Sequence, residues 1–415
     1  GKVVYQLNPD HLYMPASNNK LYSAAAAFHY LGADFRFHTS LYYDTTGNKS
    51  NLILKAGGDP DFSLGTLDSL AEIAAGHISR IDTLIIDRTI IDSIHSGHGW
   101  MWDEGHWWYA AQIDPLSLND NCVDIDFAPG HPGTPPQIIT RPTTNYVELI
   151  NQAVTVTDTI DFVEMEIERN WWENGNRITI SGEIMYDDER DTVYRNIHDP
   201  ARFTATVFQE MLTDKGLPVT GPITFRQLPS GAQLLAEHQS APLSVIANNF
   251  LKESDNLSGE LLLKTIGAVT AGEPGTWPKG LTAQKTYLCD VVGLDTTTLR
   301  IVDGSGVSRY NLTSPAQLVH LLAHVAENED FYPAFRQALP IAGVDGTLEK
   351  RMGKTPADNK VFAKTGTLSG ASTLSGYIES RRDTLVFAIM INGYVGSSNQ
   401  YRRLQDEICN ILVEY

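Results

Sequence analysis

The chain has 415 residues and a formal net charge of −19 at pH 7, because 50 acidic side chains outnumber 31 lysines and arginines. This length predicts two or three domains, with ample chain for a large core. The acidic balance argues against a nucleic-acid partner, since phosphate binding requires basic patches, and no apolar run approaches the length of a membrane-spanning segment.

The first predicted helix begins near Pro15 and continues through the alanine-rich run at 24–27. Proline suits the first turn of a helix, and alanine is the strongest helix former. Ser17 therefore falls in the first turn, and Lys20, three residues later, shares its face. An amine at this spacing can take the proton of the serine hydroxyl and make the serine a nucleophile. Alone, this pattern is also typical of an ordinary helix cap followed by a solvated lysine.

The middle of the chain predicts an alternation of strands and helices. Residues 41–44 and 51–55 flank a turn at 45–49 and predict a β-hairpin. The further predicted elements are a helix over 67–77, a strand over 83–87, a Pro- and Gly-rich loop over 129–142, a strand pair at 162–167 and 177–184, and a helix over 201–215 that stops at Gly216.

Two further motifs lie in the second half of the chain. Ser254-Asp255-Asn256 separates helical segments at 243–251 and 257–263, and Lys364-Thr365-Gly366 ends a strand. As isolated triplets they are typical of a helix cap and of an exposed strand end. Together with Ser17-x-x-Lys20, in this chain order, they are typical of penicillin-binding proteins and class A β-lactamases. The three motifs therefore predict an acyl-serine enzyme.

The last part of the chain predicts a helix over 313–326, strands over 361–364, 373–379 and 384–392, and a final helix from about Asn399. The final helix carries an apolar stripe, and its only basic residues are Arg402 and Arg403. A helix on a membrane surface needs a strongly basic polar face. The stripe therefore predicts packing against the sheet.

The spacing of the motifs has a consequence for the domains. Ser17 lies about 240 residues before Ser254, yet the chemistry requires the two to meet. The simplest arrangement is one catalytic domain built from both chain ends, with residues from about 40 to 238 inserted as an excursion.

Over most of its length the sequence resembles the low-molecular-mass class C penicillin-binding proteins, the D-alanyl-D-alanine carboxypeptidases and endopeptidases of bacterial cell walls. Besides the three motifs, the resemblance includes residues 31–37, 58–60, 109–113, 118–121, 303–309, 339–348 and 375–377. It implies an α/β (α+β) fold, with a serine β-lactamase/transpeptidase-like domain whose antiparallel sheet is flanked by helices. It also implies nested domains: residues 1–39 and 239–415 catalytic, 40–92 and 160–238 inserted in it, and 93–159 inserted in the second.

The resemblance implies acyl transfer from a D-Ala-D-Ala bond to Ser17, with Lys20 as general base. Ser254 is expected to relay the proton to the leaving amine, and Asn256 to hydrogen-bond the substrate amide. Lys364 is expected to present positive charge to the terminal carboxylate. The hydroxyls of Thr365 and Thr367 are expected to bind that carboxylate, Gly366 to let the peptide lie against the strand, and the backbone N–H groups of Ser17 and Thr367 to form the oxyanion hole.

The family also recognises the free end of a diaminopimelate side chain. The resemblance puts Arg309 in that role, with Leu368 and Ser369 beside it. From the inserted region we expect Glu104 (or Asp103) and Tyr109 to contribute. The alternative for this last segment is a packed aromatic loop, which its neighbours Trp107 and Trp108 favour.

No metal or cofactor is expected. His95, His98 and His106 lack the spacing of a ligand set, and Cys122, Cys289 and Cys409 are far apart and odd in number, without an evident disulfide framework. The expected partners are peptidoglycan peptides and, as inhibitors, β-lactam antibiotics, and the sequence does not indicate an oligomeric state. No signal peptide is visible at Gly1, as in a mature exported protein, and the expected location is the periplasm.

Two alternatives stay open. A β-lactamase shares the motifs, although the class A deacylation motif Glu-x-x-Leu-Asn is missing and class C enzymes carry tyrosine where Ser254 stands. A catalytically idle penicillin-binding sensor or scaffold is the other alternative.

Overall fold

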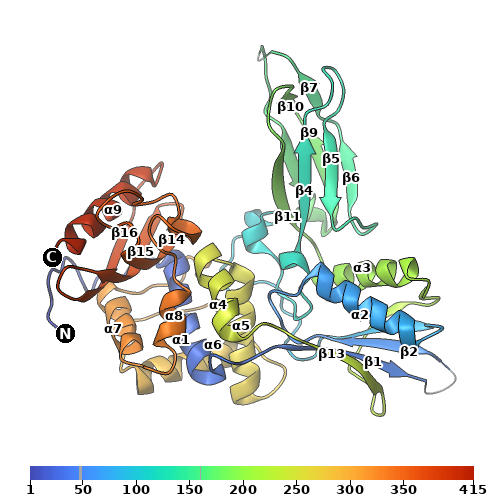
Figure 1. The fold of residues 1–415 in the computed structure, drawn as a ribbon, viewed down its shortest axis with the longest axis horizontal. Helices are drawn as coiled ribbons and strands as arrows, with labels where there is room; N and C mark the ends of the chain where they lie inside the picture. The colour runs from blue at the N-terminus through green and yellow to red at the C-terminus, as the bar shows by residue number, and fades with distance from the viewer. Residues whose placement is uncertain (46–48, 159) are drawn as a thin grey trace. The chain divides into compact units, whose positions relative to one another are not determined.

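The computed structural model describes residues 1–45, 49–158 and 160–415. The chain divides into two compact units (Figure 1). Residues 1–36, 96–100 and 241–415 form the first unit, and residues 37–95 and 101–240 form the second. The first unit therefore takes its residues from both ends of the chain. The domain boundaries given above, including the separate domain at 93–159, remain predictions.

The first unit contains one antiparallel sheet and most of the helices. The sheet has the order β14-β15-β16, with β14 (Val361–Leu368), β15 (Ala371–Glu379) and β16 (Thr384–Asn392). The helices are α1 (Lys20–Leu31), α4 (Leu243–Asn248), α5 (Asn256–Ala271), α6 (Trp277–Thr286), α7 (Pro315–Ala326), α8 (Tyr332–Gln337) and α9 (Asn399–Val413), with short turns η1 (Ala16–Asn19), η7 (Asn249–Glu253), η8 (Tyr287–Val291) and η9 (Gly346–Leu348). The strands predicted over 373–379 and 384–392 and the final helix are confirmed within two residues, whereas the strand predicted over 361–364 continues to Leu368.

The helix α5 packs closely against both α1 and the segment 303–306. Every residue of α1 from Lys20 to Phe28 is buried, and α1 packs against α5. Within α5, a methyl group on Gly259 would lie 3.2 Å from Gly304 O. Glycine at this position therefore lets the segment 303–306 lie directly on α5, next to the start of α1.

The second unit is built on a five-stranded sheet of order β12-β3-β2-β1-β13, which pairs strands both parallel and antiparallel. Its elements are β1 (His38–Asp44), β2 (Asn51–Lys55), β3 (Thr83–Asp87), β12 (Ile223–Phe225), β13 (Gln233–Gln239), α2 (Leu64–His77) and α3 (Pro200–Asp214). β1 and β2 form the predicted antiparallel pair, and residues 46–48 of the predicted turn lie outside the described residues.

The rest of the second unit consists of short strands. They are β4 (Cys122–Ala128), β5 (Gln137–Arg141), β6 (Glu148–Asn151), β7 (Val154–Val156), β8 (Glu166–Arg169), β9 (Arg177–Ser181), β10 (Glu183–Met185) and β11 (Asp191–Asn196), with turns η3 (Trp102–Glu104), η4 (Trp108–Ala110), η5 (Asn119–Asn121) and η6 (Trp171–Glu173). β8 pairs with β9 in antiparallel, as predicted for 162–167 and 177–184, although β8 begins only at Glu166 and the second segment is divided into β9 and β10.

One prediction in this region is wrong. Residues 129–142 were expected to form a loop, but Gln137–Arg141 is a strand that pairs with β4. The prolines at 135, 136 and 142 flank this strand without interrupting it, and β5 lies at the edge of its sheet. Proline disrupts a strand only where it removes a ladder hydrogen bond, so these flanking positions are tolerated.

Candidate active site

Ser17 lies in η1, the tight turn that leads into α1. The preceding residue, Ala16, has a φ of +49°, in the left-handed region that L-residues seldom occupy. Asn19 anchors the turn to the segment 303–306, because its Nδ2 donates to Asp303 O at 2.8 Å. Ser17 is half-buried, whereas Asn18, Asn19 and Lys20 are buried. The turn therefore anchors its neighbours in the core and leaves the serine accessible.

Lys20 is fully buried directly behind Ser17. Its Nζ lies 3.2 Å from Ser17 Oγ, and it donates to Asn256 Oδ1 at 2.5 Å and to Ser305 O at 2.8 Å. Burial lowers the pKa of Lys20 to about 8, while the nearby carboxylates of Asp255, Glu260 and Asp303 act in the opposite direction. The neutral amine that a general base requires is therefore accessible near neutral pH.

Ser254 and Asn256 come from the junction between η7 and α5. Ser254 has a φ of +66°, and Asp255 caps α5 by accepting from Leu257 N at 3.2 Å and Ser258 N at 2.6 Å. Backbone strain of this kind persists where the surrounding structure fixes it, and it is concentrated at functional sites. Within this motif, Asp255 is the helix cap. Its neighbours Ser254 and Asn256 instead contact Lys364 and Lys20.

Lys364 is fully buried in β14 and donates to Ser254 Oγ at 2.8 Å and to Thr365 O at 3.0 Å. Burial, and then the charge of Lys20, lower the pKa of Lys364 well below its usual value. The Asn18 amide bridges toward this strand: it lies 2.7 Å from Ser375 Oγ and, with its nitrogen toward β14, donates to Lys364 O at 2.8 Å. The structure thus brings all five predicted catalytic side chains together within the first unit.

Gly366 lets β14 lie close to η1, the turn that contains Ser17. A methyl group at this position would lie 2.7 Å from Pro15 O and 3.0 Å from Ser17 N. Glycine is therefore required here by the packing of β14 against η1, in addition to the predicted contact with a bound peptide. Any side chain at this position would displace the turn that carries Ser17.

We expect Gly366→Ala to displace this turn, lower the rate of Ser17 acylation and destabilise the fold by about 1–3 kcal/mol, as overpacking typically does. Gly76→Ala is the matched control, because Gly76 lies in α2 with no atom within 4 Å of the added methyl. Unfolding midpoints and acylation rates measure both effects. Wild-type acylation and stability in Gly366→Ala would contradict the packing argument.

The backbone of β14 offers donors to an oxyanion hole. β14 is an edge strand, and on its outer side Ala342 N donates to Val361 O and Ala363 N donates to Pro340 O, both at 3.0 Å. Because backbone direction alternates along a strand, the N–H groups of Thr365 and Thr367 point to the same side. This alternation supports the predicted role for Thr367 N–H, with Ser17 N–H beside Gly366.

Two buried carboxylates that the sequence analysis missed support the lysine. Glu260 accepts from Trp277 Nε1 at 2.6 Å, Gly304 N at 2.9 Å and Ser305 N at 2.7 Å. Burial, with the nearby Asp303 charge, raises the pKa of Glu260 to about 7. Glu260 thereby fixes the segment whose Ser305 carbonyl holds Lys20. Its spacing, one helical turn after Asn256, was the available signal.

Asp303 fixes the other side of the same segment. It accepts from Gly306 N at 2.9 Å, Ser308 N at 2.7 Å and Asn311 Nδ2 at 2.8 Å. The residue was included in the resemblance, but no role had been predicted for it.

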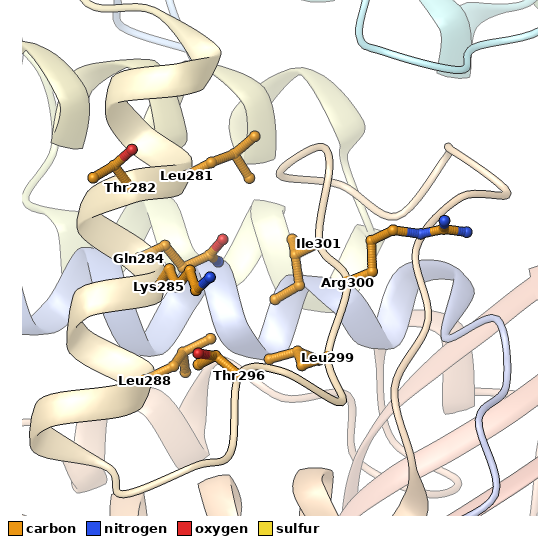
Figure 2. A pocket seen from close by; sticks show the side chains of 9 residues that line it. All are labelled: Leu281, Thr282, Gln284, Lys285, Leu288, Thr296, Leu299, Arg300 and Ile301. Atoms are coloured by element: carbon orange, nitrogen blue, oxygen red, sulfur yellow. The ribbon is translucent and has the colours of Figure 1, made fainter.

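A pocket of about 240 Å³ also lies in the first unit, lined by residues of α6, η8 and the segment 296–301 (Figure 2). Leu288, Arg300 and Ile301 are among the residues that line it, and Arg300 donates from Nε to Tyr310 O at 2.5 Å. None of the predicted site residues lines this pocket.

Residues 1–414 match the D-Ala-D-Ala carboxypeptidase 3 (S13) family. The chain belongs to this family. Similar proteins include the D-alanyl-D-alanine carboxypeptidase of Actinomadura sp. (strain R39), which is 34% identical over 100% of this chain and 79% of the relative. The carboxypeptidase DacB of Haemophilus influenzae is 29% identical over 95% of this chain and 83% of the relative. The resemblance to low-molecular-mass class C penicillin-binding proteins is therefore confirmed.

Solved structures agree with this S13 assignment. Penicillin-binding protein 4 (dacB) from Haemophilus influenzae superposes with a TM-score of 0.85 at 26% identity, covering 99% of this chain and 94% of that one. The peptidoglycan endopeptidase Bd3459 of Bdellovibrio bacteriovorus shares the fold, with a TM-score of 0.55 at 16% identity over 98% of this chain and 88% of that one. The predicted fold class is confirmed, and the enzyme is a serine-type hydrolase.

The structure brings some of the predicted substrate-binding residues of this S13 chain into contact with one another or with neighbours of β14. Arg309 Nη1 donates to Ser369 O at 2.9 Å, which places two of the predicted side-chain recognition residues in contact. Thr365 Oγ1 contacts Thr347 Oγ1 at 2.7 Å.

Glu104 and Tyr109 belong to the second unit, in η3 and η4. There the Tyr109 ring stacks on Trp107 with centroids 6.3 Å apart, as the packed-loop alternative expects. Their role toward a substrate stays a prediction. Among residues 1–45, 49–158 and 160–415, no group of three or more His, Cys, Asp or Glu side chains is arranged to hold a metal ion.

The S13 site predicts a specific pH dependence. Because the pKa of Lys20 is lowered to about 8, the neutral amine increases as pH rises toward 8. We expect the acylation rate constant with benzylpenicillin to rise about tenfold per pH unit below this value and to level off above it. Stopped-flow or quenched labelling from pH 5.5 to 9.5 measures the profile, with unfolding midpoints confirming that the protein stays folded. A flat profile between pH 6 and 8 would rule out this role of Lys20.

Proposed function

We propose that this enzyme is a D,D-peptidase that cleaves the D-Ala-D-Ala bond of peptidoglycan stem peptides through an acyl-serine intermediate. The observation that carries the proposal is the convergence of Ser17, Lys20 and Lys364 in one unit, with distances suited to proton transfer. The family and the names of its relatives support the substrate class.

In the first step, Lys20 Nζ takes the proton of Ser17 Oγ as the oxygen attacks the carbonyl carbon between the two D-alanines. The N–H groups of Ser17 and Thr367 stabilise the oxyanion, an effect worth roughly 10²–10³ in rate for each such donor. Ser254, held by Lys364, then donates a proton to the leaving amine of the terminal D-alanine. The proton on Lys20 replaces it through the lysine–serine network, and the C–N bond breaks.

In the second step, water attacks the acyl-serine carbonyl. A neutral lysine takes the proton from water, the ester C–O bond breaks, and Ser17 Oγ regains a proton. An amine acceptor in place of water gives transpeptidation by the same route. A β-lactam enters at the first step, and its acyl-enzyme keeps the leaving group tethered, so we expect inhibition.

Further parts of the proposal concern the substrate and the cell. Arg309, with Leu368 and Ser369, is proposed to bind the free end of the diaminopimelate side chain, together with Glu104 and Tyr109. Periplasmic residence is proposed because the substrate lies there. No helix in the described part of the chain is long and apolar enough to cross a membrane.

Incubation with benzylpenicillin followed by intact-mass measurement tests the reaction. A long-lived adduct on Ser17, together with D-alanine release from D-Ala-D-Ala peptides, is the expected result. Rapid turnover of the antibiotic would indicate a β-lactamase, and an adduct without peptide cleavage would indicate a sensor. Digestion of purified cell wall with mass analysis of the fragments then separates carboxypeptidase from endopeptidase activity.

A further inference from the structure

Arg402 reaches the proposed substrate-binding strand from the C-terminal helix. Its Nη2 donates to Thr367 Oγ1 at 3.3 Å, and Arg402 is half-buried while Thr367 is exposed. From the sequence, Arg402 is expected only as a basic residue on the polar side of the final helix. The contact places a guanidinium at the strand end where the proposed reaction holds the substrate's carboxylate.

Packing fixes α9 at this position. Gln405, one turn after Arg402 on the same face, is fully buried and donates to Ser372 Oγ at 3.2 Å. Ser372 is the residue of β15 directly opposite Thr367. From the other side, Arg351 Nη2 donates to Asp406 Oδ1 at 2.6 Å and to Arg402 O at 3.2 Å. The backbone that carries Arg402 is therefore tied to the strand pair that carries Thr367.

The charges around the site indicate that the Arg402 guanidinium can supply the positive charge that a substrate carboxylate needs. Lys364 was expected to supply positive charge to the terminal carboxylate, but it is fully buried next to Lys20, and its pKa is lowered well below the usual value by burial and by that charge. A guanidinium stays protonated at all physiological pH values. No acidic side chain in the described parts of the chain forms an ion pair with Arg402. Its charge is therefore available to an anionic ligand.

We propose that Arg402 binds the C-terminal carboxylate of the substrate beside Thr367 and makes the enzyme specific for chains that end in a free carboxylate. This inference rests on the proposed D,D-peptidase function. Two carboxylates of the proposed substrate are relevant here, one on the terminal D-alanine and one on the diaminopimelate side chain. Arg309 contacts Ser369 O, beyond Thr367 along the chain, so the terminal carboxylate is assigned to Arg402 and the side chain to Arg309.

Steady-state kinetics with matched peptides test the assignment. The variants are Arg402→Gln, Arg402→Lys and, as control, Arg403→Gln, which alters the exposed neighbour on α9. The substrates are an N-acylated peptide that ends in D-Ala-D-Ala and carries an uncharged third side chain, and its C-terminal amide. We expect Arg402→Gln to lower kcat/KM on the free acid about tenfold, mostly through KM, with Arg402→Lys retaining most of the activity. The control should be unchanged.

A second measurement separates binding from folding. Acylation of Ser17 is compared for benzylpenicillin and its methyl ester, which lacks the carboxylate. Loss in Arg402→Gln for the acid alone supports the inference, whereas equal loss for acid and ester, or no loss at all, overturns it. A loss confined to peptides with a diaminopimelate side chain also overturns it, by assigning Arg402 to the other carboxylate. If the wild-type enzyme releases no D-alanine, the proposed function itself fails; if it does, the result for Arg402→Gln judges this inference alone.

Discussion

Replacing Ser17 with alanine is expected to abolish covalent labelling by benzylpenicillin and to lower peptide cleavage by roughly 10³-fold or more. Ser17 Oγ is the hydroxyl at 3.2 Å from the buried amine of Lys20, and no covalent intermediate forms without it. Intact-mass measurement after incubation with the antibiotic, and D-alanine release from a D-Ala-D-Ala peptide, give the two readouts.

Ser23→Ala is the matched control for this prediction. Ser23 is a buried serine on the same helix, and its Oγ donates to Gly304 O at 2.7 Å, away from the proposed nucleophile. We expect this variant to lose some stability, about 1 kcal/mol for a buried hydrogen bond, and to keep its labelling. Labelling that persists in Ser17→Ala would refute the assignment of the nucleophile.

Replacing Lys20 with methionine is expected to lower the acylation rate by about 10²–10⁴ and to remove the rise of that rate toward pH 8. Methionine is similar in length and keeps the buried methylene packing, but it has no amine to take the Ser17 proton. It also leaves Asn256 Oδ1 and Ser305 O without their donor, so some loss of stability accompanies the change. Acylation rates as a function of pH measure the effect.

The control for Lys20 is Lys264→Met. Lys264 is equally buried, in α5, with its Nζ over the Trp277 ring at 3.6 Å from the centroid. This variant also removes a buried lysine side chain, but one that lies in α5 over Trp277. If both variants lost stability to a similar extent and only Lys20→Met lost acylation, the proton-transfer role would be supported. Retention of the wild-type pH profile in Lys20→Met would contradict it.

Local patterns predicted the elements that depend on local chemistry. The strand Thr83–Asp87 and the helix α7 agree with the prediction within two residues, and Ser314 caps α7 as part of a capping box with Gln317. Ser17-x-x-Lys20 opens a helix and Ser254-Asp255-Asn256 lies where η7 meets α5, as predicted. Lys364-Thr365-Gly366 was expected to end a strand, but it lies inside β14, which continues to Leu368. β5 was missed because its flanking prolines have the composition of a loop.

Contacts between distant parts of the chain were not predictable in the same way. Glu260 supports Lys20 through Ser305, and Arg402 reaches Thr367 from the final helix. For Glu260 the spacing from Asn256 was the available signal, but neither residue's local sequence shows which distant segment it contacts. The motifs also could not show that burial, together with the charge of Lys20, lowers the pKa of Lys364. Burial and mutual charge are properties of the folded site.

The discontinuity of the first unit has a consequence for the order of events during synthesis. Lys20 and Lys364 are separated by about 340 residues, and Met14 N donates to Asn392 Oδ1 at 2.7 Å, close to the end of the chain. At a translation speed of 5–20 residues per second, the helix that carries Ser17 waits roughly 20–70 s for its partners to leave the ribosome. A nascent or prematurely terminated chain thus contains the proposed nucleophile without the lysine of β14, and we expect reactivity only after the last strands have been made.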